Sequence, residues 1–159
     1  MPTPATPGHD LADLPGHYIR RLQQIAVAAF LQETDGFSIT PVQYAALQAV
    51  AHSPGIDQRS VARGIGFDTS TIGEVIDRLE KRGLLTRNAD PNDRRVRLLT
   101  TTAEGDGLLA DIAPAVLRVQ ELILDPLPRE ERAEFVRMLK QLVFANNSLS
   151  RAPTERVRK

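Results

Sequence analysis

The chain has 159 residues, a length that suits one compact domain with or without helical extensions. It contains no cysteine, which excludes structural disulfides, thiolate zinc sites and thiol nucleophiles. Its 20 Lys and Arg residues balance 20 Asp and Glu residues, so the net charge by itself indicates no nucleic-acid partner.

The distribution of charge along the chain qualifies that conclusion. Residues 55–102 carry nine Lys and Arg against seven Asp and Glu, a surplus of +2, whereas residues 103–135 carry three against eight. A modest local surplus is compatible with a duplex binder that makes few phosphate contacts per subunit. The sequence lacks an apolar run of 18 residues and a signal-peptide pattern, so we expect a cytoplasmic protein with no membrane span.

The N-terminal part of the chain predicts an arm followed by a helix. Prolines and small residues predict a disordered arm over residues 1–12. Apolar residues at helical spacing then predict a helix from Pro15 to Glu33, with Pro15 in its first turn. Because the opposite face of this helix also carries Val27 and Leu31, we expect it to pack on two sides.

Three further helices are predicted in the middle of the chain. Thr40 to Gln43 show the cap, proline and capping-box glutamine of a helix start. Asp57 can cap a short third helix that ends at Gly64 to Gly66, and Asp68 or Thr69 can cap a fourth. Two short helices joined by a glycine-containing turn are a candidate helix-turn-helix.

A β-hairpin is predicted after the fourth helix. Extended runs at Leu84 to Asn88 and Val96 to Thr101 enclose the turn-rich segment Asp90 to Arg95. A basic hairpin in this position is a wing. Thr102 then caps a long fifth helix, Pro128 opens a sixth, and the polar end of the chain predicts a flexible basic tail over 148–159.

The fourth helix and the hairpin together predict a DNA contact surface. The apolar residues of the helix recur at i, i+3, i+4 and i+7, which leaves small hydroxyl residues outward at its N-terminal end. Such an end can enter a major groove, and the hairpin arginines suit a narrow minor groove, with Asp93 orienting one of them. Taken alone, the helix is equally compatible with a capped surface helix, and an exposed arginine pair in a turn is more often simply solvated. The order helix, turn, helix and basic hairpin is what favours DNA binding. The predicted DNA-binding residues are Thr69, Ser70, Thr71, Gly73, Arg78, Asp93, Arg94 and Arg95.

The segments Ser70 to Leu85, Asp90 to Arg95 and Thr102 to Gly105 closely resemble the multiple-antibiotic-resistance-regulator (MarR) family, and the resemblance extends over about Leu14 to Asn146. It implies a homodimer built from the first, fifth and sixth helices, with two lobes on a pseudopalindromic double-stranded DNA operator. It also assigns the wing arginine to Arg95. Family members often have proline where this chain has an alanine at the start of the fifth helix.

The expected fold class is therefore mainly α with a small β-hairpin wing: a winged helix-turn-helix with a helical dimerisation domain. The resemblance implies one domain over 13–147. Its DNA-binding lobe is expected at about 40–102, and its dimerisation helices at about 14–33 and 103–147.

The first helix further resembles the branch of the family that controls aromatic-acid catabolism. That likeness implies release of DNA by a small aromatic carboxylate of the hydroxybenzoate, hydroxycinnamate or hydroxynicotinate class. His17, Arg21 and Gln24 share one helical stripe, where a guanidinium can hold a carboxylate bidentately. Arg20 points about 100° away and is the competing ligand-binding candidate. The alternative is that both arginines form ordinary ion pairs.

Other classes of function fit the sequence less well. None of the three histidines has a neighbour at metal-ligand spacing, and no glycine-rich phosphate loop or nucleophile elbow is present, so we expect no enzyme, no metal and no cofactor. A winged-helix protein-interaction module would favour exposed aromatic or aliphatic anchors over a basic wing. A DNA binder without an effector differs from the expected repressor only in lacking a ligand pocket.

Overall fold

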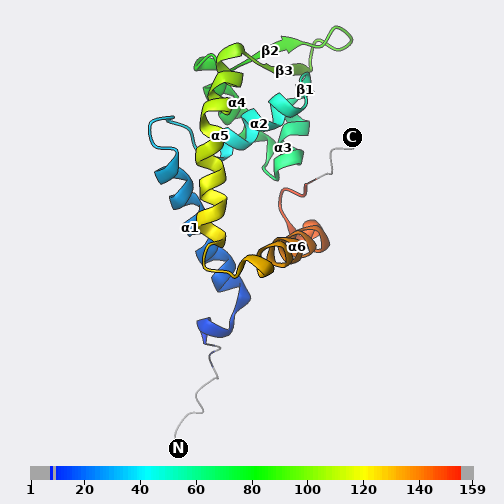
Figure 1. Ribbon diagram of the computed structural model, residues 1–159. Coiled ribbons are helices and arrows are strands. Elements are labelled where there is room, and N and C mark those ends of the chain that lie inside the picture. The colour runs from blue at the N-terminus through cyan, green and yellow to red at the C-terminus, as the bar shows by residue number, and fades with distance from the viewer. Residues whose placement is uncertain (1–7, 9, 155–159) are drawn as a thin grey trace, which may run out of the picture.

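The computed structural model describes residue 8 and residues 10–154 as a two-part, mainly helical molecule (Figure 1). One part is a compact lobe that carries a small sheet, and the other consists of long helices. The elements in chain order are η1 (Leu11–Asp13), α1 (Pro15–Glu33), α2 (Pro41–His52), β1 (Ile56–Asp57), α3 (Gln58–Ile65), α4 (Thr69–Lys81), β2 (Leu85–Ala89), β3 (Arg97–Thr101), α5 (Ala103–Leu124), α6 (Arg129–Ala145) and η2 (Asn147–Leu149).

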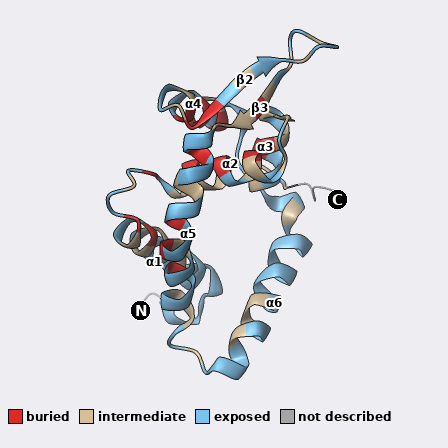
Figure 2. Cartoon of the chain, turned by 45° about the horizontal axis from the view of Figure 1, so that its top comes forward, coloured by how far each residue is buried: buried red, intermediate tan, exposed pale blue. Residues whose placement is uncertain are grey.

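Buried residues concentrate in the lobe formed by α2, α3, α4 and the sheet (Figure 2). Each of these helices contributes an apolar face, and β2 and β3 cover the same core. Removing this apolar surface from water is the main stabilising contribution to the lobe. Its largest fully buried side chains are Leu47, Ile72, Ile76, Leu79, Leu85 and Leu99.

The helix boundaries in the lobe follow the caps expected from the sequence. Thr40 and Gln43 form the reciprocal capping box of α2. Asp57 accepts from the backbone of the first turn of α3, which ends at Gly66 in the left-handed conformation, φ +75°. Asp68, and not Thr69, caps α4.

The sheet has three strands in the order β1-β3-β2, all antiparallel. The hairpin expected from the sequence is β2 and β3, and its residue Leu99 also pairs with Ile56 of β1. The sequence did not predict β1, because two residues carry no periodic signal. This strand joins the wing to the start of α3.

Backbone contacts fix the junction between the lobe and α5. Thr102 caps α5, and its hydroxyl also donates to the carbonyl oxygen of Gly83 at 2.6 Å. Gly105 is buried one turn into α5, and a Cβ placed on it would lie 2.0 Å from the carbonyl oxygen of Leu84. Only glycine allows this approach of the helix to the lobe.

The long helices leave apolar side chains uncovered. α1 packs against α5, whereas α6 leads away from the end of α5 and none of its residues is buried (Figures 1 and 2). The exposed large apolar residues on these three helices include Tyr18, Ile19, Ile25, Leu31, Leu117, Leu122, Met138, Leu142, Val143 and Phe144. Large apolar side chains exposed in this number on three helices are typical of a protein interface.

The ends of the chain are only partly described. Most of the arm expected over 1–12 lies outside the described residues, and η1 begins at Leu11. Of the tail expected over 148–159, the last five residues lie outside the described part. The flexibility of both segments stays a prediction. None of the helices in the described part is both long enough and apolar enough to span a bilayer.

Candidate nucleic-acid interface and effector site

The N-terminal end of α4 presents three hydroxyl residues to solvent. Ile72, Val75, Ile76 and Leu79 are buried in the lobe, so the opposite face of the helix is outward. Thr69, Ser70 and Thr71 are all exposed, and so is Arg78 about two turns further on. The structure therefore leaves all four of these predicted DNA-binding residues on the solvent-exposed part of α4.

Asp68 organises the hydroxyls of α4 in a way that the sequence did not reveal. Ser70 Oγ donates to Asp68 Oδ1 at 2.7 Å, and Thr71 Oγ1 donates to Asp68 Oδ2 at 2.6 Å. A hydroxyl has one proton, so each oxygen is left with lone pairs to offer to DNA. These hydrogen bonds hold the pKa of the Asp68 carboxyl well below its usual range, and the one from the Thr71 side chain has the largest effect.

Asp68→Asn is expected to make the protein less stable at neutral pH. A carboxyl whose pKa is lowered by folding contributes stability above its unfolded pKa, about 4, and loses it as pH falls through the folded pKa. The difference in urea midpoint between wild type and Asp68→Asn should therefore narrow below about pH 4. Glu74→Gln, on the exposed face of the same helix, is the control. A difference that is independent of pH would contradict this role of the carboxylate.

Gly73 faces α3. A Cβ on Gly73 would lie 3.1 Å from Nε2 of Gln58 on α3, tighter than an ordinary van der Waals contact. The space beside Gly73 is therefore occupied by a neighbouring helix of the same chain. A DNA contact by Gly73 stays a prediction.

The turn of the hairpin exposes two arginines. The side chain of Arg95 is 91% exposed, yet its Nε donates to Asp93 Oδ1 at 3.1 Å and its backbone N–H donates to the same oxygen. These hydrogen bonds lower the pKa of Asp93. Arg94 is exposed beside them. The pairing of Asp93 with Arg95 expected from the sequence is present, and it orients a cation at the tip of the wing.

Arg87 connects the hairpin to α4, the outward hydroxyl-bearing helix that we call the recognition helix. From β2 its guanidinium donates to Glu80 Oε2, with Nε at 2.9 Å, and to Asp77. The hydrogen bond to Glu80 is the largest cause that raises the pKa of Arg87. The sequence did not predict this contact, because the three residues are near one another only after the hairpin folds back. It fixes the position of the hairpin relative to α4.

Arg87→Ala should loosen the wing without removing a predicted DNA contact. We expect a decrease of about 1 kcal/mol in unfolding free energy, since solvent screens the partly exposed carboxylates. Affinity for an operator should fall more than affinity for random duplex, because the spacing of helix and wing is no longer fixed. Arg97→Ala, an exposed arginine on β3, is the control. Equal decreases for both variants in a gel shift would contradict the positioning role.

The four predicted ligand-binding residues of α1 form two pairs. Arg21 Nη1 donates to Gln24 Oε1 at 2.9 Å, and Arg20 Nη2 lies 3.4 Å from Nδ1 of His17. His17 is half-buried and the others are exposed. Neither arginine forms an ion pair with a carboxylate among the described residues. None of the four lines the two pockets described next.

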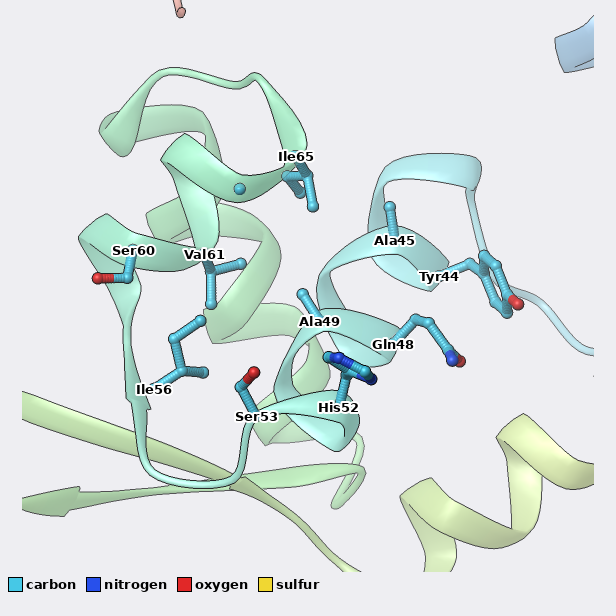
Figure 3. A pocket seen from close by; sticks show the side chains of 11 residues that line it. Tyr44, Ala45, Gln48, Ala49, His52, Ser53, Ile56, Ser60, Val61 and Ile65 are labelled. Carbon is cyan, nitrogen blue, oxygen red and sulfur yellow. The ribbon is translucent and has the colours of Figure 1, made fainter. Parts of the chain in front are cut away.

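A pocket of about 450 Å³ lies between α2 and α3 (Figure 3). Its floor is apolar, with Val61 and Ile65 from α3, while Tyr44, Gln48 and His52 of α2 line it with polar groups. Burial raises the pKa of Tyr44. An occupant would touch α3, the first helix of the helix-turn-helix. No sequence pattern indicated this pocket, because its lining residues alternate with core residues on two helices.

A second pocket, of about 330 Å³, lies where α1, α5 and α6 meet. Its lining is almost entirely apolar and includes Ile19, Leu22, Ile123 and Leu139. It is continuous with the uncovered apolar side chains of the same helices. It therefore belongs to the surface that these helices leave for an interface.

The lobe contains a helix-turn-helix formed by α3 and α4, and a basic hairpin follows it. With the exposed hydroxyl residues of α4, these features define the chain as a winged-helix DNA-binding protein. Residues 39–96 match the MarR family. The transcriptional regulator HosA of Escherichia coli O111:H- is 34% identical over 129 residues, 81% of this chain and 94% of HosA. The chain belongs to the MarR family and is a DNA-binding transcriptional regulator. The predicted fold class is thereby confirmed.

Solved structures agree with this assignment. The PcaV transcriptional regulator from Streptomyces coelicolor, in complex with its natural ligand, has a TM-score of 0.81 and 38% identity, covering 88% of this chain and 99% of PcaV. BpsR of Bordetella bronchiseptica, whose DNA binding is regulated by 6-hydroxynicotinic acid, has a TM-score of 0.80 and 29% identity, covering 85% and 96%. Regulators of this family bind DNA operators as dimers.

Proposed function

We propose that this chain is a cytoplasmic repressor that binds a pseudopalindromic operator as a homodimer and releases it when a small aromatic carboxylate binds. The observation that carries the proposal is the winged lobe, in which Arg87 holds an exposed hydroxyl-bearing helix and a basic wing in one fixed arrangement. The uncovered apolar side chains of α1, α5 and α6 support the homodimer.

The first experiment is a gel shift on the DNA upstream of the chain's own gene. Binding at low salt, with two subunits per duplex in sedimentation, supports the proposal. Because the lobe has a charge surplus of only +2, a single lobe has few cations to neutralise phosphates, and a dimer doubles them. Absence of binding at low salt would favour the alternative of a protein-interaction module.

The effector is proposed to be held through the cations of α1. Arg20 and Arg21 can each pair with a carboxylate, and His17 or Gln24 can bind a ring hydroxyl. BpsR supports the aromatic-acid class, since 6-hydroxynicotinic acid regulates its DNA binding.

Aromatic acids are expected to weaken operator binding, and Arg21→Ala is expected to abolish that response. Hydroxybenzoates, hydroxycinnamates and hydroxynicotinates should be tested, and a coupling of about 5- to 150-fold in affinity is the usual range. Arg20→Ala is the matched comparison. If the panel leaves affinity unchanged, the protein binds DNA without an effector of this class.

A second place for the effector is the pocket between α2 and α3. It is favoured by its apolar floor and by its contact with α3. Ala45→Leu narrows that pocket without changing charge. Disappearance of the response in Ala45→Leu but not in Arg21→Ala would place the acid in the pocket and contradict the α1 site.

A further inference from the structure

Gln58, the first residue of α3, lies where three elements of the lobe meet. Asp57 before it caps α3 and pairs with Leu98 of β3, so the start of α3 is attached to the hairpin. A Cβ placed on Gly73 of α4 would lie 3.1 Å from Nε2 of Gln58 and 4.0 Å from its Cδ. The amide end of this side chain therefore rests directly on the backbone of the recognition helix.

The amide of Gln58 is unpaired and open to solvent. Within the part of the chain that the structure describes, this side chain makes no hydrogen bond, and no polar side-chain atom there is both buried and unpaired. Gln58 itself is half-buried, so its stem is held between the helices while its polar end reaches water. A side-chain amide offers two N–H donors and one carbonyl acceptor, and all of them are available to a partner.

This amide lies beside the helix face that carries the exposed hydroxyls. Gly73 follows Thr69 by four residues and Ser70 by three, which places it about one turn, or roughly 6 Å, further along the same side of α4. In a helix-turn-helix on DNA, the second helix enters the major groove and the first crosses the backbone. Here α4 is the second helix and α3 the first, so a donor at the start of α3 that touches α4 faces the phosphates beside the groove.

We propose that Nε2 of Gln58 donates a hydrogen bond to a DNA phosphate oxygen beside the major groove that α4 enters. The proposal deepens the DNA binding proposed above and rests on it. Phosphate is the partner that fits, because neutral amides commonly donate to phosphate oxygens and so fix the register of a protein on the duplex. Gly73 then contributes indirectly, since the absence of a Cβ lets the amide lie against α4.

The first test removes the amide. Gln58→Ala should weaken binding on the order of tenfold, the usual value for one hydrogen bond to a charged group, on operator and random duplex alike. The slope of log K against log salt should stay as in the wild type, because a neutral side chain releases no counterion. Arg95→Ala, which removes a cation, should reduce that slope. Gln32→Ala, an exposed glutamine on α1, is the control and should bind as the wild type does.

The second test displaces the amide without removing it. In Gly73→Ala the new Cβ pushes Nε2 of Gln58 aside, so DNA affinity should fall, although less than in Gln58→Ala. In the double variant Gln58→Ala/Gly73→Ala, the second substitution should cause no further loss, because the group that it displaces is gone. Gly107→Ala on α5 is the matched control: its Cβ meets nothing within 4 Å, and DNA affinity should be unchanged.

The third test reverses the polarity of the contact. Gln58→Glu keeps the length of the side chain but places a carboxylate beside the phosphate. It should bind DNA more weakly than Gln58→Ala at low salt, and the difference between the two variants should narrow as salt screens the repulsion. Urea unfolding of each variant checks that the lobe is folded.

The phosphate contact is wrong if the wild type binds the operator and Gln58→Ala binds it equally well. It is also wrong if the loss appears on the operator alone, since Gln58 would then contact a base. If Gly73→Ala lowers affinity further in the Gln58→Ala background, Gly73 contacts DNA itself and its proposed indirect role is overturned. Failure of the wild type to bind any duplex at low salt overturns the proposed function instead, so the two failures are distinguishable.

Discussion

Gly105→Ala is expected to lower the free energy of unfolding by about 3 kcal/mol, the upper range for overpacking a tight contact. The added Cβ would lie 2.0 Å from the carbonyl oxygen of Leu84, a distance that no relaxation of a side chain can relieve, because both partners are backbone. The carbonyl also accepts from the backbone N–H of Thr102 at 3.1 Å, so moving it strains the cap of α5.

The matched control is Gly107→Ala, two residues further along the same helix. Gly107 is exposed, and a Cβ on it would meet nothing within 4 Å. This substitution should raise stability by about 1 kcal/mol through helix propensity alone. Urea unfolding at one protein concentration gives both values. If the two alanines shift the midpoint in the same direction, the close contact of Gly105 does not decide stability.

Arg95→Ala is expected to weaken DNA binding by about tenfold, with an effect that shrinks as salt rises. The Arg95 side chain is 91% exposed and is aimed by Asp93, so its removal changes neither the core nor the hairpin. Because the contact is mainly electrostatic, the weakening should appear on many DNA sequences. Arg97→Ala, an exposed arginine at the start of β3 and outside the turn, is the control.

Ser70→Ala or Thr71→Ala should behave differently from Arg95→Ala. These hydroxyls are expected to meet base edges, so their removal should change which operator is preferred and leave the salt slope almost unchanged. Selection of preferred sites from random duplexes measures the first effect and a salt titration the second. If both kinds of variant lose affinity in the same way, the assignment of base contacts to α4 and of electrostatic contacts to the wing is wrong.

The sequence predicted the elements whose signals are local. Asp57 and Thr102 cap helices through bonds to residues three positions away, and Gly66 ends a helix through its own backbone conformation. Such signals can be identified in a short window. The same holds for Asp93 and Arg95, which are two residues apart.

Features that depend on residues distant in the sequence were not predicted. β1 exists because Ile56 meets Leu99, and Arg87 reaches Asp77 and Glu80 only once the hairpin packs on α4. The contact of Thr154 with Gly66 joins residues nearly ninety positions apart. No periodicity or cap predicts such pairings, because they follow from the packing of whole elements.

The backbone contact at Gly105 has a mechanical consequence. It leaves no room for α5 to slide over the lobe, so we expect the lobe and α5 to move as one rigid body. In a dimer, a ligand that tilted the long helices would therefore change the separation of the two recognition helices. Major grooves on one side of B-DNA recur about every 34 Å, so a shift of a few ångströms would put the pair out of register while each lobe stayed intact.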